Sequence, residues 1–523
     1  MPQPQAPQGQ ARTVAQPPRL PLVSTLDTRT NEYTSISPYE DSNLQIQKDA
    51  RLVNGYIEMD PNDQKNRWIY KRPGVGGTAL YAPAAGVGRG VCAINNYSGS
   101  GVLYYVVGDT LYGNGANLGT LSTSTGPVSL LPGPPLGGWA GNPTVPILMI
   151  YDGTYGYFYS PGGIYTGLNQ LGTSNNFTTN PIVPGFVFAD SYFYIMDAYG
   201  NIWGTQNQND PRYWPVLDVI VAGNEPSPGV ALAKQLAYVV AFKQNSIQVF
   251  YTAGGIATTE GSPLQNIPEA QIPLGCMNGN TVAGIDEVLL WVTFNGVLSP
   301  QVARMTNLST RICSTPAVER ILSNISWARI STPDVFAYTM KIAGHRFYVL
   351  TSIPAQSTLV YDIDQNYWSF WTNSNPAAAN YWPFIGSVAL PAVGDLSPQL
   401  VTQSIANGGI YPIDGAYIYP NDLNQSTTVD IYTPNFDAGV DRRKMLNMMR
   451  FNADQTPGSL LQVRHSDDDY QSWSNFRTVD LGLERPFLKN EGTFRRRAYH
   501  IRHAAQTSLR IKSVDLTMDI GTL

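Results

Sequence analysis

The sequence has little cysteine and little histidine, which limits the chemistry that it can carry. Its 523 residues include three Cys and four His. Cys92, Cys276 and Cys313 are odd in number and far apart, so the sequence suggests neither a disulfide framework nor a CxxC metal site. His500 and His503 are three residues apart on an expected strand and point to opposite faces, so we expect no metal cage. We expect a reducing compartment and no cofactor.

Charged residues are scarce as well, at 14% of the chain against roughly a quarter in average proteins. The formal net charge of −5 argues against a generic nucleic-acid coat, because such proteins need excess Lys and Arg to displace counterions from phosphates. The sequence has no uninterrupted apolar stretch of about 18 residues, and its N-terminus has no apolar signal region. We therefore expect neither a membrane-spanning segment nor export through a cleaved signal.

Glycine, proline and tyrosine are abundant instead, with 48, 39 and 31 residues. Together with few Glu, Lys and Arg, they favour strands and turns over helices. Short β-branched and aromatic runs recur, each ended by a Gly, Asn or Asp turn, and successive runs start about 44 to 58 residues apart. A four-stranded propeller blade has about 40 to 50 residues. The sequence therefore predicts an all-β fold with a β-propeller of six or seven blades, and an evenly spaced β-sandwich is the alternative.

The two ends of the chain differ from its repeating middle. Residues 1–22 are rich in Pro and Gln and have few apolar anchors, so we expect a flexible arm. Between Arg442 and Lys512, 14 Lys and Arg stand against 7 Asp and Glu, a local charge of +7 that leaves −12 for the remainder. We predict four parts: the arm (1–22), a segment joining a platform (23–77), the propeller (78–425) and a basic, sandwich-like C-terminal β domain, the platform (426–523).

The expected strands of the C-terminal domain alternate between apolar and basic residues. Leu461 and Val463 share one face of their strand, while Arg464 lies on the other. The basic face is either a solvated sheet surface or a patch for a partner subunit or for passing phosphate.

A hairpin motif follows this strand. Ser466, Asp468, Ser472 and Trp473 resemble the Asp-box turn of sialidases and other propellers, in which the Asp caps the turn and the Trp packs beneath it. Tyr470 stands where that motif has Gly, which predicts a wider or strained turn. The motif has a structural role and gives no catalysis by itself.

Signatures of catalysis are missing from the sequence. It contains no Gly-Lys dipeptide, no His-Glu-x-x-His and no Gly-x-Ser-x-Gly. A sialidase would also need three arginines around one carboxylate, but Arg495, Arg496 and Arg497 are contiguous and cannot all face one ligand from a strand. We expect no catalytic residues and no enzyme. A glycan- or receptor-binding propeller, and a glycosidase with an unidentified carboxylate pair, remain as alternatives.

Several motifs, taken in their order from about residue 25, resemble the phage stabilisation proteins, the tail nozzle or hub family of short-tailed bacteriophages. They are RLVNGY (51–56), YKRPG (70–74), WP (214–215) with Glu225, SIQVFY (246–251) with Gly254, GC (275–276), VTFNG (292–296), RICSTPAVE (311–319), YD (361–362), WS (368–369) and RHSDD (464–468) with WS (473–474). The Pro/Gln-rich arm and Tyr470 depart from the family pattern.

The resemblance implies a structural virion protein of the phage tail, assembled in the host cytoplasm. It implies a homo-oligomeric ring of six copies that extends and closes the portal–adaptor channel, retains packaged DNA and opens for ejection. The implied partners are the adaptor (head-to-tail connector), tail fibres or a tail needle, and double-stranded DNA in transit without sequence-specific binding. We expect six residues to contact an acidic surface of the adaptor or of a neighbouring subunit: Arg442, Arg443, Lys444, Arg495, Arg496 and Arg497.

Overall fold

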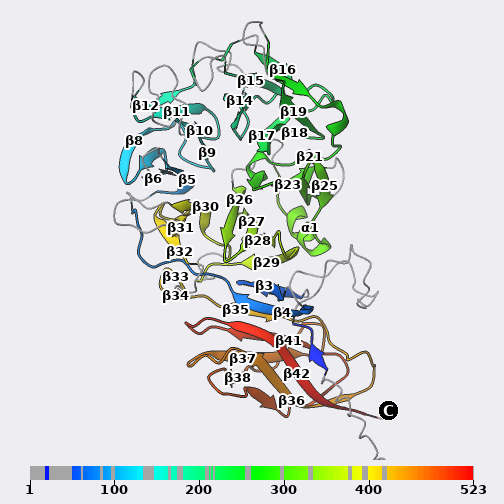
Figure 1. The fold of residues 1–523 in the computed structure, drawn as a ribbon. Coiled ribbons are helices and arrows are strands. Elements are labelled where there is room, and N and C mark those ends of the chain that lie inside the picture. The colour runs from blue at the N-terminus through cyan, green and yellow to red at the C-terminus, as the bar shows by residue number, and fades with distance from the viewer. Residues whose placement is uncertain are drawn as a thin grey trace, which may run out of the picture.

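The computed structural model describes residues 18–22, 50–60, 63–82, 86–95, 101–133, 147–162, 166–172, 181–205, 211–212, 214–215, 218–253, 261–294, 300–327, 334–374, 380–390, 399–414 and 421–521. Within these ranges nearly all regular structure is β-strand (Figure 1). The one α-helix among them is α1 (Pro316–Ser323), and the 3-10 turns are η3 (Pro268–Ala270) and η4 (Gly279–Thr281). The predicted all-β class is confirmed.

The upper part of the molecule in Figure 1 is a β-propeller whose sheets follow one another along the chain. The first two blades are β5 (Gly88–Asn95), β6 (Gly101–Val107), β7 (Thr110–Gly113) and β8 (Ala116–Thr120), then β9 (Ser129–Pro132), β10 (Leu148–Tyr151), β11 (Gly156–Ser160) and β12 (Gly167–Gln170). The third and fourth are β13 (Val187–Ala189), β14 (Tyr192–Met196), β15 (Asn201–Gly204) and β16 (Val219–Val221), then β17 (Gly229–Gln235), β18 (Tyr238–Lys243), β19 (Ile247–Thr252) and β20 (Leu264–Asn266).

Two further blades have four or more strands. The fifth contains β21 (Gly275–Cys276), β22 (Ala283–Ile285), β23 (Val288–Phe294), β24 (Gln301–Thr306) and β25 (Ser309–Ile312). The sixth contains β26 (Val335–Ile342), β27 (His345–Ser352), β28 (Ser357–Asp362) and β29 (Tyr367–Trp371). Strand pairing within both blades is antiparallel.

A seventh sheet completes the ring, and the N-terminal segment closes it. Its described strands are β30 (Phe384–Leu390), β31 (Gln399–Ser404) and β32 (Ile410–Ile413). Residues 75–81 run along the free edge of β32, where the Leu80 amide donates to the Ile410 carbonyl at 2.8 Å and the Ile410 amide donates to the Tyr81 carbonyl at 2.9 Å. The prediction of six or seven blades is confirmed, with six sheets of four or more strands and this smaller seventh sheet.

Hydrophobic clusters fill the space between successive blades, which explains why the blade strands are apolar on both faces. Val106 of β6 packs in one cluster with Ile150 of β10. Phe242 of β18 contacts Trp291 of β23, with ring centroids 5.2 Å apart. Tyr105 lies in the cluster that joins the first blade to the seventh sheet. Each blade therefore depends on both of its neighbours for burial of its apolar surface.

Below the propeller lies a platform of two packed sheets (Figure 1). One sheet contains β1 (Arg19–Leu20), β3 (Gly55–Asp60), β4 (Asp63–Lys71), β36 (Lys444–Ala453), β39 (Phe487–Lys489), β40 (Thr493–Phe494) and β42 (Arg510–Ile520). The platform strands of the other sheet are β2 (Arg51–Val53), β35 (Val429–Tyr432), β37 (Leu460–Ser466), β38 (Arg477–Asp480) and β41 (Ala498–His503). One apolar core joins the two sheets. The short hairpin β33 (Asn421–Asp422) and β34 (Gln425–Ser426) precedes β35.

The second platform sheet is continuous with the sixth blade. β2 pairs in parallel with β29 at Val53 and Phe370, and it pairs antiparallel with β35 at Leu52 and Ile431. One nine-stranded sheet therefore runs from β26 in the propeller to β38 in the platform. The two parts share backbone hydrogen bonds across this sheet, in addition to the chain connections between them.

Residues 18–22 depart from the flexible arm expected over 1–22. β1 pairs with β42, and Leu20 and Leu22 are buried in the platform core. These two leucines are apolar anchors of the kind that the preceding Pro/Gln-rich residues lack. Residues 1–17 of the expected arm lie outside the described ranges.

Candidate functional site

The two predicted arginine segments lie together on the platform, and Lys444 joins them. Its ammonium donates to the backbone carbonyls of Arg442 at 2.9 Å and of Arg495 at 2.6 Å, and it also contacts the Val440 carbonyl. The Lys444 side chain is fully buried, and burial lowers its pKa. The expectation that Lys444 contacts another protein is therefore wrong, because its ammonium is buried and donates its hydrogen bonds to backbone carbonyls inside the platform.

Arg497 is also buried. Its guanidinium forms a two-point ion pair with Asp467, with Nε to Oδ1 at 2.6 Å and Nη2 to Oδ2 at 2.8 Å, and Nη1 donates to the Glu491 carbonyl at 2.6 Å. The Phe494 ring centroid lies 4.6 Å from the guanidinium. Arg497 stabilises the turn before β41, so its assignment to a partner surface is wrong as well.

The remaining four arginines stay on the surface as predicted contact candidates. Arg442, Arg443, Arg495 and Arg496 are exposed. Arg496 forms an ion pair with Asp469, while the other three form none with the described residues. An exposed guanidinium without a carboxylate keeps its donors available for an acidic partner.

The predicted Asp-box hairpin has the expected hydrogen bonds. Asp468 accepts from the Ser466 hydroxyl at 2.8 Å and from the Ser472 amide at 2.9 Å, and the hydrogen bonds from Ser472 and Ser466 lower its pKa to about 2. Tyr470, in place of Gly, has φ of 65° in the left-handed region. Its hydroxyl donates to the Thr433 carbonyl at 2.6 Å, which compensates for the unfavourable backbone conformation.

Trp473 of this hairpin covers the basic face of the C-terminal sheet. The Arg464 guanidinium stands 5.0 Å from the Trp473 ring and donates from Nε to His500 Nδ1 at 2.9 Å. His500 Nε2 lies 2.6 Å from Asp430, so the imidazole is neutral with its proton on Nε2. Burial lowers the pKa of His500. This face is therefore neither a bare solvated surface nor a free patch.

A buried arginine forms the junction between propeller and platform. Arg72 pairs with Asp422 through two hydrogen bonds, one of them at 2.9 Å between Nη1 and Oδ1, and its Nε donates to Asn54 Oδ1 at 3.0 Å. The guanidinium lies over the Trp382 ring at 4.0 Å and the Trp371 ring at 5.5 Å. Both side chains of the ion pair are almost completely buried. This junction fastens the segment before the first blade to the sixth blade and to β33.

Asn54 extends the junction and explains the RLVNGY motif. Its side-chain amide donates to Thr372 Oγ1 and to the Thr428 carbonyl, both at 2.8 Å, while its backbone has φ of 55°. The following Gly55 is required by space, because a Cβ there would lie 2.9 Å from the Tyr70 carbonyl. Sequence reasoning noted this motif and YKRPG as family marks but missed their contact with Asp422, which lies far along the chain.

Two basic side chains are buried next to this junction. Lys71 donates to the Ala505 carbonyl at 3.1 Å, and burial lowers its pKa to about 8. His503 contacts the Ser459 hydroxyl at 2.9 Å, and burial together with the Lys71 charge lowers its pKa to about 3. The uncharged form of His503 is therefore the one that fits the folded platform.

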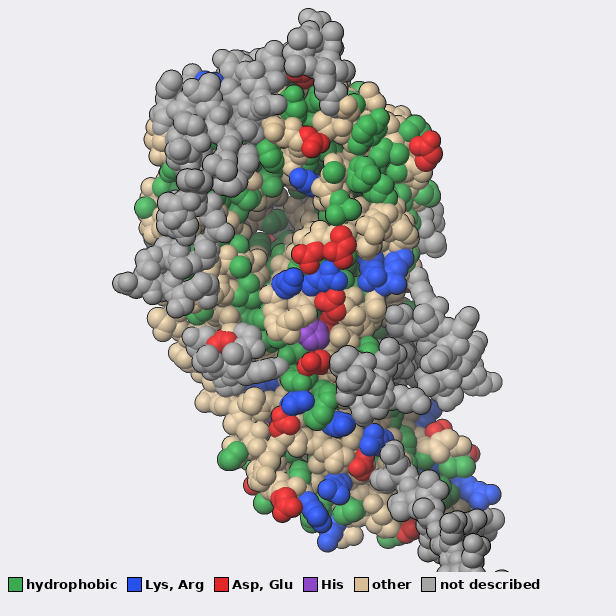
Figure 2. Space-filling model, in the orientation of Figure 1, with side chains coloured by type: hydrophobic (Ala, Val, Ile, Leu, Met, Phe, Trp, Pro, Cys, Tyr) green, Lys and Arg blue, Asp and Glu red, His purple; other side chains and the backbone are tan. Residues whose placement is uncertain are grey.

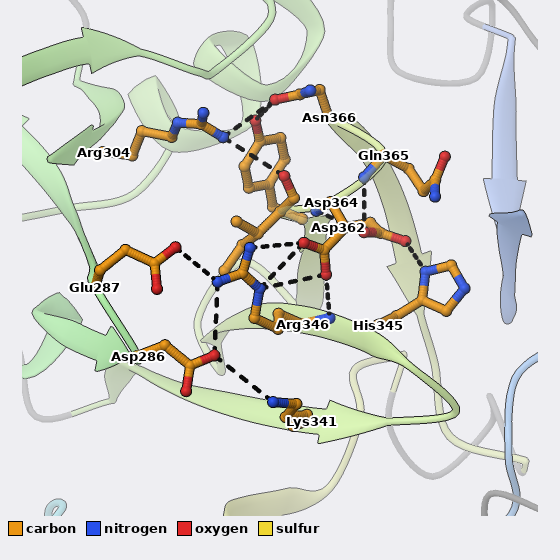
Figure 3. Close-up of polar contacts among 12 residues, drawn as sticks. Asp286, Glu287, Arg304, Lys341, His345, Arg346, Asp362, Asp364, Gln365 and Asn366 are labelled. Carbon is orange, nitrogen blue, oxygen red and sulfur yellow. Dashed lines mark hydrogen bonds and ion pairs between the residues drawn. The ribbon is translucent and has the colours of Figure 1, made fainter. Parts of the chain in front are cut away.

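A charged seam joins the fifth and sixth blades (Figure 3). Arg346 forms ion pairs with Asp364 at 2.7 Å and with Glu287 at 3.0 Å. Beside it, His345 Nδ1 lies 2.7 Å from a buried carboxylate oxygen of Asp362. Burial disfavours the charged imidazole of His345, but the hydrogen bond and charge of Asp362 outweigh it, so its pKa is raised. Sequence reasoning did not find this seam, because its residues come from separate turns.

A cavity of about 470 Å³ lies at the centre of the propeller ring, where Figure 2 shows a hollow. It is lined by the innermost strands of the seven sheets and their flanking residues, with Gly90, Ala231, Phe336 and Gly386 among them. Among the described residues that line it there is no Asp or Glu, whereas hydrolysis of a glycoside needs a carboxylate pair. The described residues hold no cluster of three His, Cys, Asp or Glu suited to a metal, and none of their helices is long and apolar enough to cross a membrane.

Comparison with known proteins places these features in a family. Among solved structures, similar chains include BBS1N in complex with ARL6DN (TM-score 0.38, 11% identity, 65% of this chain and 95% of that chain) and BamB from Moraxella catarrhalis (0.34, 10%, 70% and 94%). The computationally designed Ika8 protein is a third (0.33, 10%, 68% and 96%). No curated protein matches. Residues 48–389, about two thirds of the chain, match the family described as bacteriophage P22 Gp10, β-propeller. The chain therefore belongs to this phage stabilisation family, whose members are structural proteins of the phage tail.

Proposed function

We propose that the protein is the tail nozzle, or hub, subunit of a short-tailed phage. Six copies would form a ring that extends the portal–adaptor channel, retains the packaged DNA and opens for ejection. The observation that carries this proposal is the fusion of propeller and platform through one nine-stranded sheet and the buried Arg72–Asp422 pair. A ring that holds back DNA needs subunits whose two parts do not flex against each other. Family membership supports the structural role in the tail.

The exposed arginines of the platform are the proposed contact surface for the adaptor or the next subunit. A ring requires two different, complementary patches on each copy. Arg442, Arg443, Arg495 and Arg496 supply guanidinium groups that pair with carboxylates through two hydrogen bonds. Tail fibres or a tail needle would dock elsewhere on the ring, and assembly would take place in the host cytoplasm.

The overall charge supports passage of DNA without capture. Each phosphate that a protein neutralises adds affinity for DNA. The chain has a formal net charge of −5, and several of its basic side chains are buried, including Lys71, Arg72, Lys444 and Arg497. DNA in transit would therefore meet a surface that does not hold it.

Electron microscopy of the purified chain, alone and mixed with portal–adaptor complexes, tests the proposal. We expect a sixfold ring with an axial channel in at least the mixed sample. Particles that stay single and never join the portal–adaptor complex would refute the nozzle function.

A charge-reversed variant tests the contact surface separately. Replacement by Glu at Arg442, Arg443 and Arg495 is expected to abolish attachment or ring formation at physiological salt. The matched control reverses three other exposed platform cations, Arg450, Arg485 and Lys489, and is expected to assemble normally. If the test variant assembles like the wild type, the arginines are not part of the interface, but the proposal of a ring is not affected.

A further inference from the structure

Two arginines of the fifth blade face each other across neighbouring strands. Arg304 of β24 and Arg311 of β25 are direct cross-strand partners. Like charges in this position destabilise a sheet unless something neutralises them. Arg304 is half-buried and Arg311 is exposed, so the pair lies where the seam with the sixth blade opens to solvent. A bound anion would remove the repulsion between the two guanidinium groups.

The described residues supply only neutral acceptors to this pair. Asn366 Oδ1 accepts from Arg304 Nη1 at 3.1 Å, from Arg311 Nη2 at 2.6 Å and from the Tyr361 hydroxyl at 2.9 Å. The Ile363 carbonyl lies 3.5 Å from Arg304 Nη1. In the part of the chain that the structure describes, no carboxylate lies within 4.0 Å of either guanidinium.

A neighbouring arginine on the same seam, Arg346, is neutralised by carboxylates of the protein. Arg346 has three carboxylates within 3.5 Å, from Asp286, Glu287 and Asp364 (Figure 3). These acids are thus occupied by Arg346. Asn366, only two residues after Asp364, carries an amide at the position where a carboxylate would neutralise Arg304 and Arg311. Arg304 and Arg311 together carry a charge of about +2 that an external anion can neutralise.

Both guanidiniums retain unused donors. An arginine has five N–H groups, and Nε and Nη2 of Arg304, like Nε and Nη1 of Arg311, have no hydrogen-bond partner among the described residues. Arg304 Nε is buried without a partner, so the donors open to an external anion are Arg304 Nη2 and the unused donors of Arg311. Guanidinium pairs of this kind bind phosphate and carboxylate groups through parallel hydrogen bonds.

We propose that Arg304 and Arg311, held by Asn366, form a binding site for one oxyanion group, a phosphate or a carboxylate. Asn366 positions both guanidiniums through its shared amide oxygen while adding no charge of its own. Tyr361 fixes that oxygen from the interior of the sixth blade. The site is formed by the fifth and sixth blades of one chain and does not depend on the proposed ring or on the arginines of the platform.

Titration of the full-length protein with inorganic phosphate tests the site, with calorimetry and thermal unfolding as readouts at constant ionic strength in chloride. We expect saturable binding and a saturable rise in Tm. Arg311→Gln, an exposed change that the fold tolerates, is expected to weaken binding at least tenfold. Arg450→Gln removes an exposed arginine of β36 and serves as the matched control, with wild-type binding expected. A parallel titration with acetate decides between phosphate and carboxylate as the preferred group.

Asn366→Asp gives a second, independent test. It places a carboxylate between the two guanidiniums, so it should raise Tm without phosphate and abolish the response to phosphate. A response to phosphate that is not saturable, or that is the same in wild type, Arg311→Gln and Asn366→Asp, would overturn the proposal and indicate only non-specific ionic effects.

Discussion

Replacing Asp422 by Asn should separate the stability of the propeller–platform junction from that of the rest of the molecule. Asp422 is 2% exposed and holds the guanidinium of Arg72, which is 1% exposed. The substitution keeps the size of the side chain and removes its charge, which leaves a buried guanidinium without a counterion. Breaking one side of a buried ion pair costs about 3 to 5 kcal/mol.

The surroundings place the expected loss at the lower end of that range, about 3 kcal/mol. Arg72 keeps the carbonyls of Pro73 and Thr372 and the side-chain oxygen of Asn54 as acceptors. It also keeps the face of Trp382, which attracts a cation. These contacts solvate part of the charge that Asp422 no longer neutralises.

Urea unfolding followed by tryptophan fluorescence measures the effect, because Trp371 and Trp382 flank the guanidinium. Hydrogen exchange adds a local readout at the amide of Leu423, which donates to the Val75 carbonyl at 3.0 Å. We expect faster exchange there than in the wild type.

The control is Arg19→Gln, which breaks the exposed ion pair of Arg19 with Asp515 and should change stability by about 1 kcal/mol or less. A loss below about 1 kcal/mol for Asp422→Asn, with unchanged exchange at Leu423, would refute the view that this buried pair fastens the two parts together.

Three further predictions concern other parts of the fold. The unfolded chain protonates His503 near pH 6.5, but the folded chain does so only near pH 3. Folding stability should therefore fall by about 1.4 kcal/mol per unit as the pH drops between these values. Urea unfolding of His503→Gln at pH 5.5 and 4.5 should show a pH dependence of stability that is smaller by about this amount than in the wild type, and an unchanged pH dependence would contradict the assignment. Ala343 has φ of 52° in an exposed two-residue turn, so Ala343→Gly should stabilise the protein by about 0.5 to 1 kcal/mol in thermal unfolding, and a lower Tm would argue against that turn. Asp468→Ala should speed hydrogen exchange at the Ser472 amide, while unaltered exchange would show that Asp468 does not cap the hairpin.

The repeating part of the fold was predictable because its signal is local. Runs such as residues 103–107 and 192–196 are buried on both faces between neighbouring blades, so they are apolar throughout and recur at the spacing of a blade. Closure of the ring could not be predicted in the same way. The pairing of Leu80 and Tyr81 with Ile410 depends on where two distant parts of the chain meet, and neither segment has a pattern that specifies its partner.

Charge patterns predicted the platform but misplaced individual side chains. Lys444 and Arg497 belong to basic runs that we expected to be exposed. Inside the fold, however, Lys444 donates to backbone carbonyls and Arg497 pairs with Asp467. Basic residues are almost never fully buried without partners, and a single sequence does not show which acceptors surround a strand end. The same limit hid Arg304 and Arg311, because their pairing follows from the register of β24 and β25.

The meeting of the two chain ends determines when the protein can fold during its synthesis. The platform core contains Leu52 from the beginning of the chain and Ile511 from its end, and the ring closes only when Ile410 reaches Tyr81. Ribosomes add about 5 to 20 residues per second, so the early strands wait for tens of seconds with their edges uncovered. Folding that depends on such distant contacts is slow, and its intermediates are prone to aggregation. We therefore expect nascent chains to depend on chaperones, and we expect the platform core to be complete only after β42 has left the ribosome.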